Sequence, residues 1–65
     1  MQEKQTIKLY HMDSHEYRGC IRVEGKEWRF EGVEDAHLVK TVKGMPLKAL
    51  LANLICFELV YDMEE

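Results

Sequence analysis

Segment 17–32 constrains the fold more than any other part of the chain, because it predicts a β-hairpin of defined register. Gly25 and Lys26 separate two stretches in which apolar and polar residues alternate. Glycine at the first central position favours a type II′ turn, whose twist matches that of paired strands. The opposite pairs are then Glu24 with Glu27, Val23 with Trp28, Arg22 with Arg29, Ile21 with Phe30, and Gly19 with Gly32.

The alternation also predicts which side chains share a face of this hairpin. Successive residues of a strand point to opposite sides. One face is expected to be apolar, with Tyr17, Ile21, Val23, Trp28 and Phe30. The other face is expected to hold Arg18, Cys20, Arg22, Glu24, Glu27, Arg29 and Glu31. A one-residue slip would scramble both sets, so their agreement supports the register.

Further elements are expected on both sides of the hairpin. Alternation over 7–12 predicts a first strand, and the polar segment 13–16 predicts a turn. A helix is expected between an N-cap at Asp35 and a C′ residue at Gly44, although the β-branched residues in 36–43 leave a strand as the alternative. Pro46 suits the first turn of a second helix, whose apolar stripe is Leu47, Leu50, Leu51, Leu54 and Ile55.

Alternation over Cys56–Met63 predicts a closing strand, with Phe57, Leu59, Tyr61 and Met63 on one side. The predicted fold class is therefore α+β: a small antiparallel sheet made of a three-strand meander and a closing C-terminal strand, with one or two short helices on one face. Residues 1–65 are expected to form one small domain, with residues 1–5 disordered or frayed.

The segment Leu47–Tyr61 holds twelve apolar residues in fifteen, in a chain of only 65 residues. A domain of this size is marginally stable, and small chains often cover surplus apolar surface by forming symmetric dimers. We therefore expect a small regulatory module that binds proteins, most simply a homodimer, or one with a protein partner. The residues expected at the dimer or partner core are Leu50, Leu54, Cys56, Phe57 and Val60.

The polar hairpin face and the acidic C-terminal strand are the expected partner-binding surfaces. Their charged residues are Arg18, Arg22, Arg29, Glu58 and Asp62. The three arginines also suggest an alternative function, a nucleic-acid-binding regulator that contacts phosphates. Interleaved glutamates and the absence of stacking aromatics on this face argue against that alternative.

A metal-binding domain is the second alternative. His11, Asp13 and His15 are spaced two residues apart, so on an extended chain all three side chains would point the same way. Imidazole and carboxylate are ligands that zinc accepts. Turns also collect Asp, Ser and His, so solvated turn residues are the simpler interpretation.

Catalytic, cofactor and membrane functions find little support in the sequence. Ser14 is the only serine and lies next to His15, and no glycine-rich phosphate loop occurs. We expect no enzyme activity and no cofactor. Cys20 and Cys56 are expected to be reduced thiols, and no signal segment or membrane span is evident. A cytoplasmic location is therefore expected.

Overall fold

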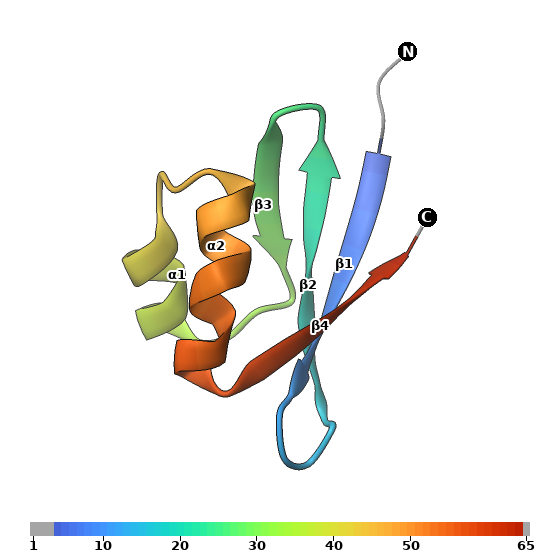
Figure 1. Cartoon of the computed structure of the whole chain (residues 1–65), viewed down its shortest axis with the longest axis vertical. Coiled ribbons are helices and arrows are strands. Elements are labelled where there is room, and N and C mark those ends of the chain that lie inside the picture. Colours follow the sequence, from blue (N-terminus) through green and yellow to red (C-terminus); the bar gives the residue numbers. More distant parts are fainter. Residues whose placement is uncertain (1–3, 65) are drawn as a thin grey trace.

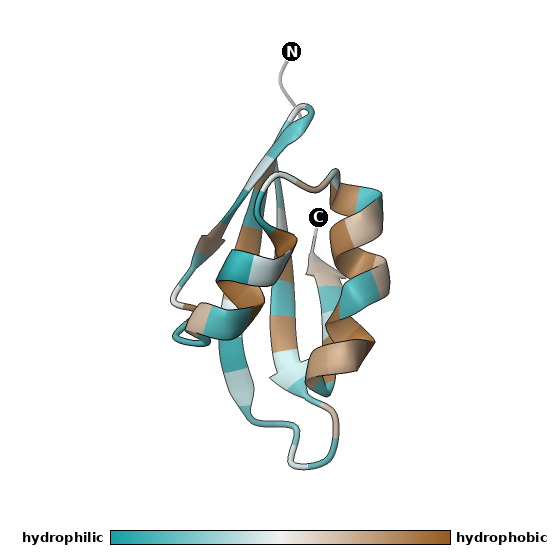
Figure 2. Ribbon diagram, turned by 90° about the vertical axis from the view of Figure 1, so that its left-hand side faces the viewer, coloured by the Kyte–Doolittle hydropathy of each residue, from teal (hydrophilic) through white to brown (hydrophobic). Residues whose placement is uncertain are grey.

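The computed structural model describes residues 4–64 and confirms the predicted α+β fold class. Four strands form one antiparallel sheet in the order β3-β2-β1-β4. Two helices and a 3₁₀ turn lie together on one face of it (Figures 1 and 2). In chain order the elements are β1 Lys4–His11, β2 Tyr17–Glu24, β3 Glu27–Glu31, α1 Ala36–Val42, α2 Leu47–Asn53, η1 Leu54–Phe57 and β4 Leu59–Glu64.

The N-terminal strand begins earlier than the alternation predicted. Lys4 and Gln5 belong to β1 and stand opposite Glu24 and Val23 of β2. The prediction of a frayed segment over 1–5 is therefore wrong for these two residues, and residues 1–3 lie outside the described part. Strand β2 is eight residues long, so it offers pairing partners to Lys4 and Gln5 as well as to the rest of β1.

The hairpin register is confirmed between Cys20–Glu24 and Glu27–Glu31. Gly25 has φ 61°, and Lys26 is not among the residues with positive φ. This combination is that of a type II′ turn, because type I′ requires positive φ at both central residues. The local turn chemistry thus determined the pairing of β2 with β3.

Tyr17 lies on the opposite face from the one predicted. Leu9 stands opposite Gly19, whereas the next residue, Tyr10, stands opposite Tyr17, so β2 carries one extra residue at Arg18. Such a bulge reverses the alternation beyond it. Tyr17 is 55% exposed, and its ring meets that of Tyr10 edge-on at 5.8 Å on the outer face of the sheet.

The first helix is confirmed, and the strand alternative over 36–43 is wrong. The Asp35 carboxylate accepts a hydrogen bond from the backbone N–H of Leu38 at 3.1 Å. This bond satisfies one of the free N–H groups that every helix start presents. Gly44 has φ 82° and follows the C-cap residue Lys43, as expected for a glycine that ends a helix.

The second helix is confirmed, but Pro46 precedes it as the N-cap instead of lying in its first turn, and its end also differs from the prediction. It begins after Pro46, and from Leu54 to Phe57 the chain tightens into the 3₁₀ turn η1. Glu58, with φ 59°, then turns the chain into β4. The predicted stripe position Ile55 is consequently 65% exposed, and the closing strand begins at Leu59 rather than at Cys56.

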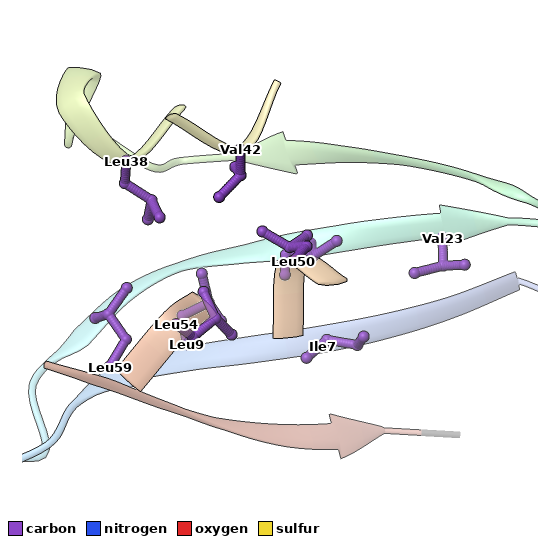
Figure 3. Close-up of a cluster of buried hydrophobic side chains, with 9 residues drawn as sticks. Ile7, Leu9, Val23, Leu38, Val42, Leu50, Leu54 and Leu59 are labelled. Carbon is purple, nitrogen blue, oxygen red and sulfur yellow. The ribbon is translucent and has the colours of Figure 1, made fainter. Parts of the chain in front are cut away.

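The core fills the space between the helices and the inner face of the sheet (Figure 3). Trp28 closes its β3 side, and its indole N–H donates to the carbonyl of Met45 at 2.6 Å. Burial of each large aliphatic side chain contributes roughly 1.5–3 kcal/mol relative to exposure. The core cluster consists of Ile7, Leu9, Ile21, Val23, Leu38, Val42, Leu50, Leu54 and Leu59.

Candidate interaction surface

Strand β4 lies at one edge of the sheet, and its backbone pattern follows from the ladder with β1. The Met12 N–H donates to the Glu58 carbonyl at 2.7 Å, and these two residues continue the register in which His11 faces Leu59. In an antiparallel pair, hydrogen-bonded positions alternate along the strand. Val60 and Asp62 therefore direct their backbone groups toward β1.

The remaining residues of β4 direct their N–H and C=O groups outward. These residues are Leu59, Tyr61 and Met63, whose side chains share the inner face with Leu9 and Ile7 of β1. Leu59 is 7% exposed because α2 and η1 cover the start of the strand. Farther along, β4 runs away from the helices (Figure 1), and Tyr61 and Met63 are 45% and 46% exposed.

An apolar groove of about 340 Å³ adjoins this edge, between β4 and the segment formed by α2 and η1. Ile55, the most exposed large apolar residue described, lies on its rim. Contiguous exposed apolar surface of this kind marks interaction sites in soluble proteins. The groove is lined by Leu51, Ala52, Leu54, Ile55, Leu59, Val60 and Tyr61. We call the outward backbone of β4, its exposed Tyr61 and Met63, and this groove the β4 surface.

The opposite edge of the sheet is protected. The outer face of β3 carries Glu27, Arg29 and Glu31, all of them exposed. Its inner side chains, Trp28 and Phe30, pack edge-to-face at 5.2 Å and border the core. Charged side chains on an edge strand discourage pairing with another chain. Among the side chains described on β4, Asp62 alone is charged, and Lys8 stands opposite it.

Arg22 and Arg29 share the outer face predicted from the sequence, whereas Arg18 lies in the β2 bulge and borders a cleft with Asp35; carboxylates accompany the arginines in both places. Arg22 Nε donates to Glu31 Oε2 at 2.6 Å, and this hydrogen bond lowers the pKa of Glu31 and raises that of Arg22. Arg18 Nη2 lies 3.9 Å from Glu16 Oε2, and Arg29 stands opposite Arg22. A phosphate would have to compete with these carboxylates. The nucleic-acid hypothesis stays a prediction, and no distance on this face favours it.

The five residues predicted at the dimer or partner core lie in different environments. Leu50 and Leu54 are buried in the chain's own core, whereas Cys56 and Val60 are exposed and Phe57 is half-buried against His37. Of the predicted dimer core, the structure therefore brings only Val60 onto β4. Sequence alternation identified Tyr61 and Met63 as inward-facing, but it contained no signal that the helices stop short of them.

The spacing of His11, Asp13 and His15 does not produce a metal centre. His11 ends β1, and its Nδ1 accepts hydrogen bonds from the backbone N–H groups of Asp13 and Ser14 at 3.2 and 3.3 Å. Its Nε2 lies 3.4 Å from Glu58 Oε2. His15 has φ 60° and is exposed. The three side chains would converge only on an extended chain, but this segment is a hairpin loop. Within residues 4–64, no three His, Cys, Asp or Glu side chains are placed so that they could hold a metal ion.

Two further features lie near the β1–β2 loop. A cleft of about 520 Å³ is bordered by the charged side chains of Glu16, Arg18, Glu34 and Asp35, with His11 beside them, so three carboxylates and one guanidinium line it. On the outer face, a hydrogen bond with the Cys20 side chain raises the pKa of Tyr17. Four separate segments form the cleft, which explains why no local pattern predicted it.

Comparisons with protein-family models, with curated proteins and with solved structures find no match. Within residues 4–64, no helix is long and apolar enough to cross a membrane.

Proposed function

We propose that this protein is a small protein-interaction module that binds another polypeptide at the β4 surface. The observation that supports the proposal is the coincidence of two features on one edge. Leu59, Tyr61 and Met63 direct their backbone groups outward, and the side chains of Tyr61 and Met63 remain about half exposed beside an apolar groove.

Strand addition is the binding mode that such an edge supports. An added strand gains affinity from main-chain hydrogen bonds, and pockets for its alternate side chains provide specificity. The β4 edge offers the hydrogen-bonding groups, and the groove offers an apolar pocket next to Leu59. The charged face of β3 leaves β4 as the edge suited to this role.

The proposed compartment is the cytoplasm. Cys20 is buried and Cys56 is exposed, and both thiols are free. An exposed free thiol persists most readily where the surroundings are reducing. This supports the cytoplasmic location expected from the sequence.

Site-specific photo-crosslinking in living cells tests the proposal. A benzophenone amino acid is introduced at position 61 or, as the matched control, at position 17. Tyr61 is 45% exposed and Tyr17 is 55% exposed, so both probes are accessible, but only the first lies on the β4 surface. We expect protein adducts from position 61 and not from position 17. Equal adducts at the two positions, or none at position 61, would contradict the proposal.

A further inference from the structure

We propose that the polypeptide bound at the β4 surface is a second copy of this chain. The two β4 strands would pair antiparallel about a twofold axis and join two four-stranded sheets into one. This inference rests on the proposed function, because it names the occupant of the same surface. Symmetric dimers are the commonest protein assembly, and a twofold interface requires a surface that complements itself.

The backbone of β4 complements itself in one register better than in the others. With the axis at Tyr61, Leu59 faces Met63 of the second copy and Tyr61 faces its own equivalent. All of these residues direct their backbone groups outward. Each such pair exchanges two N–H···O=C bonds, as a hydrogen-bonded antiparallel pair does.

Pairing about a neighbouring axis is less favourable, because of the residues that it sets opposite one another and because of the 3₁₀ turn η1 that precedes β4. An axis at Val60 places Met63 opposite Phe57, which lies in the 3₁₀ turn and cannot continue a ladder. An axis at Asp62 sets this carboxylate directly opposite its equivalent, and like charges in that position destabilise a strand pair. Axes nearer either end of the strand overlap fewer outward-facing residues.

Within residues 59–63 the side chains also agree with the register centred on Tyr61, and the paired segment ends there because Glu58 lies outside β4 in a left-handed turn. On the inner face, Met63 of the second copy lies beside Leu59, next to the apolar groove whose rim carries Ile55. This contact would cover Met63 and Tyr61, the exposed apolar side chains at the uncovered end of β4. On the outer face, Asp62 faces Val60 of the second copy, and on its own β1 side it stands opposite Lys8.

Disulfide trapping tests the register directly. In a Cys56→Ser background, Tyr61→Cys places two thiols on the twofold axis. Hydrogen-bonded antiparallel pairs have Cα atoms about 5.5 Å apart, which a disulfide can bridge. Met63→Cys is the matched control, with nearly equal exposure of the parent side chain. Its equivalent in the second copy lies four residues along the ladder, roughly 14 Å away, beyond disulfide reach.

We expect Tyr61→Cys to form covalent dimers at least about tenfold faster than Met63→Cys under mild oxidation at micromolar concentration. Equal rates, or a faster reaction at position 63, would overturn the register. Because the strand and groove form a small interface, we expect self-association in the micromolar range by light scattering.

Tyr61→Pro provides an independent variant. It removes an outward N–H and leaves the ladder with β1 intact, and proline is tolerated in edge strands at such positions. We expect at least about tenfold weaker self-association, because two hydrogen bonds across the axis are lost. Circular dichroism confirms that the variant is folded. Tyr61→Lys, which sets two ammonium groups opposite each other, should weaken association similarly.

The outcomes separate this inference from the proposed function. A chain that stays monomeric up to about 1 mM, yet gives cellular adducts from position 61 with a different protein, overturns self-pairing and supports the interaction module. Adducts of twice the chain mass, together with faster trapping at position 61, support both. A monomer without adducts overturns both.

Discussion

Gly19 is the position where one added methyl group should lower the free energy of unfolding most, and the structure gives the size of this effect. A Cβ built at Gly19 lies 2.7 Å from Val33 Cγ2 and 2.8 Å from both the carbonyl carbon and the oxygen of Gly32. Gly19 also has φ +112°, where L side chains are strained. At Gly25, with φ +61°, the same methyl group would meet nothing within 4 Å.

The comparison of Gly19→Ala with Gly25→Ala therefore contrasts a strained position that is also crowded with a strained position that is open. Positive φ alone costs roughly 1–2 kcal/mol, which is the whole effect expected at Gly25. Overlap with backbone atoms in a packed site adds typically 1–3 kcal/mol. The expected total at Gly19 is about 2–5 kcal/mol, which is comparable with the whole stability of a domain of this size.

Urea denaturation followed by the fluorescence of Trp28, which is half-buried against Phe30, measures both variants. With a slope near 1 kcal/mol per molar urea, Gly25→Ala should lower the midpoint by about 1–2 M and Gly19→Ala by about 2–5 M. If the two variants unfold within about 0.5 kcal/mol of each other, the close approach of Gly19 to Gly32 does not exist as described.

Three other predictions concern the N-cap, the ion pair and the thiols. Asp35→Ala should lower the free energy of unfolding by about 1 kcal/mol, since it removes the bond to the Leu38 N–H; in urea melts, Asp35→Asn should retain most of the stability. Arg22 lowers the pKa of Glu31 in the folded state. The ion pair therefore stabilises the fold fully above the pKa of Glu31 in the unfolded chain, about 4.3, and this stabilisation is lost as the pH falls through the lower pKa of the folded state. In thermal melts at successive pH values, Glu31→Gln should therefore be less stable than the parent at pH 7, and the difference should vanish in acid; an equal effect from Glu34→Gln would contradict the pairing. A thiol reagent should modify the exposed Cys56 at once and the buried Cys20 only as the domain opens, whereas simultaneous reaction of both would show that Cys20 is not shielded.

Local patterns predicted the parts of the fold that depend on local contacts. The turn at Gly25 and Lys26 determined the pairing of β2 with β3, because a two-residue turn admits one register. Asp35 and Gly44 bounded α1 because capping involves residues only a few positions apart. The same alternation failed at Tyr17, because the bulge next to Gly19 arises from pairing with β1.

The candidate site was predicted in part. The sequence places surplus apolar residues in Leu47–Tyr61, and the groove beside β4 is formed from part of this segment. Leu50 and Leu54, predicted at a dimer or partner core, are both buried by a single chain. Periodicity shows which side of an element is apolar, but it does not show whether that side meets the chain's own core or another molecule.

The sequence by itself determined the hairpin, both ends of α1 and the two-sided character of the closing strand, because alternation and capping are properties of neighbouring residues. Only the tertiary structure decided that β4 joins the sheet beside β1. The position of β4 depends on how α1, α2 and η1 pack over the sheet, because they set where the chain re-enters the sheet. This packing leaves the backbone of Leu59, Tyr61 and Met63 directed outward and the ends of two apolar side chains uncovered.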